Sequence, residues 1–436
     1  MYDYQDFFHF RMNARYTFDY AFRVLLAILP FMTILSIFTR EKLGIPGFSF
    51  LKEALLLVML LTIVWYHVKG IRRIQLTRID LLFGSYVGVL VGVSTFTTGI
   101  SGILFGGRYD FSFLLAFFIV YHGVGFLEKT KAYYIKIFIV SGGIMLAISM
   151  LLKWPLSEDL LLYFGYSGNP SNWQFGSSIP IFHGVDGANV RRFQGLLDGP
   201  NTMGAFLLMY MGVFTYYFRH FQKWHFFIGC VLSIMLMLII YTYSRSALLG
   251  FFAGVGFIIL FLLPKIYKKY KIEFISILIF VTILLGAFFI QYSGTMKALL
   301  GRAGSTSGHL ERMKIGISRF IENPMGQGLG SAGPAYRHVQ NLENKDRKEV
   351  EEIDKKFIPE SWYIQQLVEG GFLGLLLFLV IIGSMFRDLM KKNIILAGTF
   401  LAILTMNFFL HTFESAIVSL LLFSLIALIV APHEKS

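Results

Sequence analysis

The chain has 436 residues, of which 56% are hydrophobic and only 15% are charged. A soluble protein normally carries about a quarter charged residues, so the composition indicates a polytopic membrane protein and excludes an ordinary soluble enzyme. The single cysteine, Cys230, excludes an internal disulfide and a multi-cysteine metal site. The first twenty residues are polar and aromatic, so no cleavable signal peptide is expected.

Twelve apolar segments are predicted to cross the membrane, because each is close to the roughly 17–25 residues that a transmembrane helix needs. In chain order they cover residues 22–39, 51–67, 79–97, 112–127, 133–152, 201–218, 224–243, 246–264, 274–292, 362–386, 393–410 and 415–430. The predicted fold class is therefore all-α, with one transmembrane domain over residues 1–436.

The basic residues are concentrated in every second connection between these helices. One set of connections holds 15 Lys and Arg residues, whereas the opposite short connections hold four. The positive-inside bias predicts that the first set of connections is cytoplasmic, and with it both termini. The expected location is the cytoplasmic membrane. The net charge of +13 is then mainly a topology signal, and no nucleic-acid partner is expected. Two long connections, residues 153–200 and 293–361, are predicted to lie on the outer face.

The first outer connection is rich in Gly, Ser, Asn and Pro, which is typical of turns. It ends with Arg191 and Arg192, and Asn201 follows as a candidate cap of the next helix. Arg245 begins another helix at the same face. Because arginine at a membrane face is expensive to desolvate, several arginines on one side predict a bound polyanion such as phosphate.

The second outer connection is predicted to contain a helix whose apolar face rests on the membrane domain. Arg312 and Arg319 are seven residues apart on this helix and so project together from another face, with Arg302 before them. The apolar face consists of Leu310, Met313, Ile317 and Phe320.

A glycine-rich segment follows, in which Gly328, Gly330 and Gly333 match the letters of G-x-G-x-x-G. No strand precedes it and no Lys-Ser/Thr pair follows, so a flexible turn shaping an outer cavity is predicted instead of a nucleotide site. The next run contains Glu352 and Asp354 among lysines, which favours a solvated helix over a metal site.

Glu360 ends this connection, directly before a membrane helix. A carboxylate at such a boundary can have a raised pKa and act as a base. Alternatively, it is a helix-terminal residue that the helix dipole favours.

The segment 190–375 resembles the O-antigen ligase/polymerase family of bacterial envelope glycosyltransferases, and three elements carry the resemblance. The first is R-x-x-G-x(4)-P-N, present as Arg192, Gly195, Pro200 and Asn201. The second is S-R-small, present as Ser244, Arg245, Ser246 and Ala247. The third joins R-x(11)-P-x-G-x-G to E-x-G-x-x-G, present as Arg312, Pro324, Gly326, Gly328, Glu369, Gly371 and Gly374.

One position departs from the ligases of this family, which commonly place a histidine nine residues before the last glutamate. Here that position is Glu360, in the sequence E-S-W-Y-I, which looks more like the polymerases. His309 and His338 lie in the same connection but do not align with the family histidine. The general base is therefore Glu360, His338 or absent.

The resemblance implies a GT-C-like enzyme that polymerises polyprenyl-diphosphate-linked oligosaccharides at the outer face, with inversion and without metal or cofactor. Arg192 and Arg245 are expected to stabilise the diphosphate leaving group, and Glu360 to act on the acceptor hydroxyl. Expected partners are the lipid-linked donor and acceptor and the bilayer, with a chain-length regulator as a further candidate. The substrate-binding residues are expected to be Arg191, Asn201, Arg312, Arg319, Gly328 and Tyr363.

Other functions stay open at this point. A ligase would transfer the glycan to a different acceptor, and a flippase would move the lipid-linked glycan without chemistry. No internal repeat of the kind found in many transporters is evident, which favours an enzyme. Aromatic side chains near the outer face either form an interfacial belt or stack on sugar rings; these are Trp154, Trp173, Trp362 and Tyr363.

Overall fold

The computed structural model describes residues 4–71, 74–169, 179–181, 184–185, 188–269, 303–341 and 345–432. The described chain is helical apart from one short hairpin, which agrees with the predicted all-α class. The hairpin pairs β1 (Gly184–Val185) with β2 (Ala188–Arg191) in the first outer connection, where turns alone were expected. A predicted span, 274–292, and the residues Trp173 and Arg302 lie outside the described residues.

The N-terminal half begins with α1 (Tyr4–Ile28) and α2 (Met32–Glu41), which are joined through the short 3-10 helix Leu29–Phe31 into one span. Pro30 lies in this 3-10 helix, where proline has no N–H group to continue the α-helical hydrogen bonds. The following helices are α3 (Leu51–Val68), α4 (Arg78–Phe96), α5 (Gly99–Asp110), α6 (Ser112–Gly123) and α7 (Lys131–Lys153).

The C-terminal half continues with α8 (Pro200–Phe218), α9 (His225–Tyr241) and α10 (Arg245–Lys269). The second outer connection forms α13 (Ala303–Glu322), α14 (Ala335–Gln340) and α15 (Arg347–Phe357). The chain closes with α16 (Trp362–Lys392), α17 (Ile394–Met406) and α18 (Ala416–Val430).

Six described helices are long and apolar enough to cross a membrane, or seven if the bent pair α5–α6 is one span. The shorter apolar helices Phe226–Tyr241, Ile394–Met406 and Ala416–Val430 also fall on predicted spans. These helices agree with an all-α membrane protein, whereas the number of twelve stays a prediction.

Helix α5 was missed by the sequence analysis, because its glycines are typical of a loop. In the structure two of these glycines face the glycine-rich turn: a Cβ on Gly102 would lie 2.5 Å from Leu329 O, and one on Gly106 would lie 2.5 Å from Gly330 N. Small residues therefore let the helix and the turn pack backbone to backbone.

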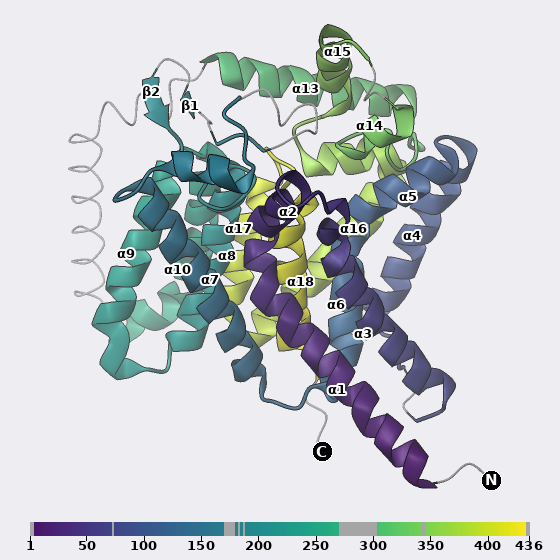
Figure 1. Cartoon of the computed structure of the whole chain (residues 1–436), viewed down its shortest axis with the longest axis vertical. Helices are drawn as coiled ribbons and strands as arrows, with labels where there is room; N and C mark the ends of the chain where they lie inside the picture. The colour runs from purple at the N-terminus through teal and green to yellow at the C-terminus, as the bar shows by residue number, and fades with distance from the viewer. Residues whose placement is uncertain are drawn as a thin grey trace.

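The helices form a bundle around α18, which lies at its centre (Figure 1). Every residue from Ile417 to Val430 is buried, and α18 packs against α6, α8 and α16. A helix that is apolar all round belongs in the interior of a protein, which explains this position. Both termini lie at one end of the bundle, and α13, α14, α15 and the hairpin cover the opposite end (Figure 1).

Candidate active site

Arg192 is held at the covered end of the bundle by two different elements. Its Nε atom donates to Thr242 O and its Nη2 atom donates to Asn201 Oδ1, each at 2.8 Å. The neighbouring backbone is fixed by a bond of 2.8 Å from Phe193 N to Tyr241 O. Asn201 is therefore not the helix cap that the sequence predicted: Gly199 takes that position, Pro200 begins α8, and the Asn201 side chain orients Arg192.

A cavity of about 350 Å³ brings Arg192 and Asn201 together with Arg245 at the start of α10. The three arise from separate parts of the sequence, and the two guanidinium groups give this cavity a positive wall. Guanidinium groups suit phosphate oxygens, because a planar arginine side chain can donate two parallel hydrogen bonds to them. The other described residues that line it are Tyr243, Ser244, Ser246, Leu249, His309, Leu310, Met313, Phe409 and Leu410.

Helix α13 places His309 in the lining of this cavity and Arg312 close to it. His309 and Arg312, three residues apart and so on one face of the helix, both contact the Glu360 carboxylate. His309 Nδ1 lies 3.1 Å from Glu360 Oε2, and Arg312 forms an ion pair with Oε1. Helix α13 can approach this closely because Gly316 faces Pro359 and Ile364, where a Cβ would lie 2.8 Å and 2.5 Å from their side chains.

The environment of Glu360 keeps its carboxyl group ionised. Burial raises the pKa of Glu360, but the contact with His309 and the charges of His309, His411 and Arg312 lower it more, so the net shift is downward. This direction is opposite to the raised pKa that was expected of a carboxylate at the membrane boundary. The residue is therefore a lasting negative charge beside Arg312 and His309.

Backbone strain also gathers at this site. Among the described residues, Tyr243, Asn341 and Glu360 are the non-glycine positions with positive φ. Asn341 ends a helix, where the left-handed conformation is common. Tyr243 (φ 50°) lines the cavity and Glu360 (φ 55°) lies behind it. Such conformations cost about 1–3 kcal/mol and concentrate at functional sites.

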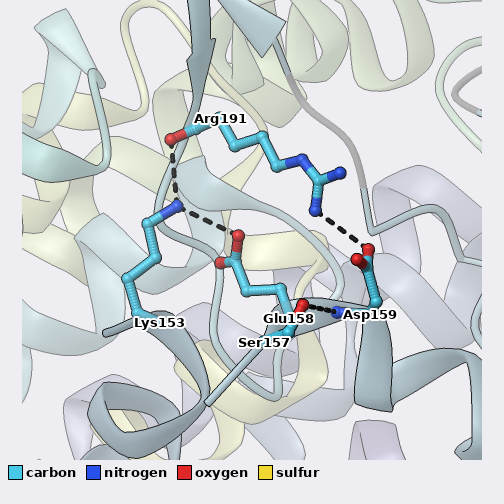
Figure 2. Close-up of polar contacts among 5 residues, drawn as sticks. All are labelled: Lys153, Ser157, Glu158, Asp159 and Arg191. Atoms are coloured by element: carbon cyan, nitrogen blue, oxygen red, sulfur yellow. Dashed lines mark hydrogen bonds and ion pairs between the residues drawn. The ribbon is translucent and has the colours of Figure 1, made fainter. Parts of the chain in front are cut away.

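Arg191 lies outside the lining of this cavity, although it precedes Arg192 directly. Its guanidinium forms an exposed ion pair with Asp159 at 3.0 Å, and its carbonyl accepts a hydrogen bond from Lys153 Nζ at 3.1 Å (Figure 2). Lys153 also pairs with the buried Glu158 at 3.0 Å. This cluster ties the hairpin to the end of α7 and leaves Arg191 with a structural role.

Arg319 and Tyr363 also lie outside the lining of the cavity. The Arg319 guanidinium stacks 3.5 Å from the ring centroid of Phe357, and Tyr363 donates a hydrogen bond to Leu404 O at 2.9 Å. Arg312 and Arg319, which lie on the same helix, therefore contact different partners. Trp362 is fully buried beside Phe113 and cannot stack on a sugar.

The glycine-rich turn is buried against the bundle, so Gly328 does not line the cavity. Gly326, Gly328, Gly330 and Gly333 all have positive φ, between 69° and 97°. Gly328 N donates to the backbone carbonyl of Glu369 at 2.9 Å, and Gly330 N donates to its side chain at 2.9 Å. The turn is thus a fixed support of α16, not the flexible outer turn that the sequence predicted.

A buried polar network below the turn joins distant helices, and the sequence analysis missed most of it. Tyr86 donates to Gln366 Oε1, and Gln366 Nε2 donates to Asp110 Oδ1 at 2.8 Å. Asp110 and Glu369 are 1% and 0% exposed. The signal in the sequence was the presence of polar side chains inside apolar helices, where they normally face a bundle interior.

Two further cavities differ from this one in character. The first, about 330 Å³ and almost wholly apolar, lies between α8, α10 and α17, the helices whose outer ends border the arginine cavity. The second, about 620 Å³, lies near the C-terminus and contains His122, which pairs with Asp80 at 3.0 Å. None of its described lining residues is an arginine or a lysine, so it does not suit an anionic group.

Several apolar helices and a cationic cavity at one end define a multi-pass α-helical membrane protein. Residues 230–379 match the family model described as O-antigen ligase. This match agrees with the resemblance to the O-antigen ligase/polymerase family that the sequence motifs carry. The matched segment extends from α9 into α16 and contains Arg245, Arg312, Glu360 and Glu369, whereas Arg192 precedes it. No curated protein matches the chain.

Proposed function

We propose that this protein polymerises polyprenyl-diphosphate-linked oligosaccharides at the outer face of the cytoplasmic membrane. The observation that carries the proposal is the convergence of Arg192, Arg245 and His309 on one cavity, with Glu360 behind His309. The cavity offers cations for a diphosphate and a basic group for an acceptor hydroxyl at the same place. The O-antigen ligase domain supports this class of glycosyl transfer.

In the proposed reaction, an acceptor hydroxyl attacks the anomeric carbon of the donor sugar while the lipid diphosphate leaves. Negative charge grows on the diphosphate oxygen, and Arg192 and Arg245 stabilise it. Their charge is permanent, and Arg192 is already oriented by Thr242 and Asn201. A single displacement of this kind inverts the anomeric centre, and the arginines supply the positive charge that a metal ion would otherwise provide.

The apolar cavity between α8, α10 and α17 suits the prenyl chain of such a substrate. The diphosphate would lie between the arginines and the chain would extend along the same three helices towards the other end of the bundle. A lipid-linked substrate explains why a polar site lies directly above an apolar one.

The test uses purified protein in detergent with a polyprenyl-diphosphate-linked oligosaccharide and EDTA. Wild-type protein should produce a ladder of longer lipid-linked products. Arg245→Ala and Arg192→Ala should each slow the reaction by about a hundredfold or more, since the loss of one charge-stabilising donor costs roughly 2.7–4 kcal/mol in the transition state. Arg191→Ala is the matched control, because this neighbouring arginine is held outside the cavity by Asp159.

The product pattern separates the two activities of the family. A ladder supports a polymerase. A single transfer that occurs only with a different acceptor supports a ligase, which the description of the matched family model favours as the second candidate. Failure of both with the native glycan would contradict the proposed function.

A further inference from the structure

Glu360 is poorly placed to take a proton from a substrate. Its side chain is only 14% exposed, and it is not among the described residues that line the cavity. Arg312 occupies one carboxylate oxygen and His309 approaches the other. A carboxylate held between an arginine and a histidine is a weak base, because both partners stabilise its ionised form.

His309 has the position that Glu360 lacks. Its side chain is 37% exposed and lines the cavity together with Arg192 and Arg245. Since Nδ1 faces the carboxylate, Nε2 is the ring nitrogen left to meet a substrate. The Nδ1 contact has hydrogen-bond distance without hydrogen-bond alignment, which is common for catalytic pairs before substrate binds.

We propose that His309 is the general base that accepts the acceptor hydroxyl proton, and that Glu360 is the positioning residue that holds and neutralises its imidazolium form. This inference rests on the proposed glycosyl transfer and deepens it. Arg312 takes part by pairing with the other oxygen of the Glu360 carboxylate.

The proton and electron balance of the step is complete within the site. The acceptor oxygen forms the new bond to the anomeric carbon, and its proton moves to His309 Nε2. The bond between that carbon and the diphosphate oxygen breaks, and the electron pair leaves with the diphosphate. His309 becomes an imidazolium beside the Glu360 carboxylate, an arrangement in which a carboxylate orients and stabilises a histidine base.

The charged groups around His309 favour this division of roles. Glu360 is the anion that contacts it, while Arg312 on the same helix and Arg192 and Arg245 across the cavity are cations. Burial lowers the pKa of His411 to about 4, so its positive charge acts on Glu360 only at acidic pH and is absent at neutral pH. The ionised Glu360 carboxylate therefore stabilises the positive charge that His309 gains when it accepts a proton.

The first experiment measures the transfer rate of wild-type protein against pH. With His309 as base, the rate should fall as pH decreases, because a protonated imidazole cannot take the proton of the acceptor hydroxyl. If Glu360 were the base, its lowered pKa would keep the rate constant until the pH fell below the usual range of a glutamate carboxyl group. An acidic limb that is unchanged when His309 is replaced by alanine would overturn the proposal.

Three variants complete the test. His309→Ala should lower kcat by about a hundredfold with a small change in KM, remove the acidic limb, and regain activity when free imidazole is added. Glu360→Gln should lower kcat and move the acidic limb to lower pH, because the imidazolium loses its carboxylate partner. His338→Gln is the control, since this histidine stacks on Phe105 with ring centroids 5.0 Å apart and is not among the described residues that line the cavity.

The outcomes distinguish the proposal from its foundation. An inactive wild-type protein would contradict the glycosyl transfer itself. An active wild type with an active His309→Ala variant, or with an acidic limb that persists in that variant, would overturn only the role of His309. Thermal unfolding of each variant shows whether a lost activity reflects a misfolded protein.

Discussion

The adjacent residues Arg191 and Arg192 contact different partners, because their side chains point to opposite sides of an extended backbone. Arg191 ends strand β2, and successive side chains of an extended chain point to opposite sides. Arg192 therefore turns towards Thr242 and Asn201, while Arg191 turns towards Asp159. The sequence motif contains Arg192, but both arginines were expected at the substrate, and the structure places only Arg192 in the lining of the cavity.

Backbone conformation also explains why Gly326 of the P-x-G-x-G motif and Gly371 of the E-x-G-x-x-G motif are glycines. Gly326 has φ 97°, and a Cβ there would lie 2.6 Å from the backbone oxygen of Glu369. Gly371 interrupts α16 with φ 64° and receives the turn at that kink. Because both contacts are to backbone, no side-chain movement can make room for a larger residue.

Gly326→Ala should therefore destabilise the protein by about 1–3 kcal/mol, the usual cost of a strained backbone position. The decrease is measured as a lower thermal unfolding temperature in detergent. Gly308→Ala, in α13, is the matched control: a Cβ there meets nothing within 4 Å, so stability should hold or rise slightly. Equal effects of the two substitutions would contradict the packing role of the turn.

At the scale of elements, α8, α10 and α17 connect the polar site to the apolar cavity. Their close approach depends on small residues, since a Cβ on Gly254 would lie 2.5 Å from Gly398 O. The lipid bilayer is as apolar as this cavity, so a prenyl chain gains shape complementarity there but little hydrophobic free energy. A modest and chain-dependent effect on substrate binding is the expected consequence.

Val255→Trp fills the apolar cavity and should raise KM by about threefold to tenfold for a donor with a long prenyl chain. A donor with a short prenyl chain should bind both proteins equally, because it does not reach the cavity. Steady-state kinetics with the two donors provides the measurement. Val64→Trp, on the exposed surface of α3, is the control, and an equal loss with both donors would exclude the cavity as the chain site.

At the scale of the whole molecule, the arrangement of the bundle agrees with the charge pattern of the sequence. The connections predicted to be outer lie at the end opposite to both termini (Figure 1). The candidate site lies at that end, because α13 and the segments around Arg192 and Arg245 meet there. The side of the membrane that this end faces is a prediction from the basic residues.

Single-cysteine labelling tests this orientation in a background in which Cys230 is replaced by serine. Glu349→Cys in α15 should react with a membrane-impermeant maleimide in intact cells whose envelope admits the reagent to the outer face of this membrane. Lys129→Cys, between α6 and α7, should react only after permeabilisation. The reverse pattern would place the active site on the cytoplasmic side and contradict the proposed outer reaction.

The sequence by itself indicated a multi-pass membrane protein, most helix positions, a resemblance to the O-antigen ligases, and the two arginines that line the cavity, Arg192 and Arg245. Apolar length and charge alternation are properties of local sequence, so they can be recognised without knowing the fold. The helix that contains Gly102 and Gly106 was not predicted, because these glycines pack against Leu329 and Gly330, more than two hundred residues away.

Only the tertiary structure decided which polar groups meet. The sequence did not indicate a role for His309, because this residue and Glu360 are far apart along the chain. In the structure His309 Nδ1 lies 3.1 Å from Glu360 Oε2. The lowered pKa of Glu360 likewise depends on cations that α13 and the segment after α17 bring to it. Local pattern fixed where helices form, whereas the charge and protonation of the site follow from long-range packing, since electrostatic interactions depend on distance in space.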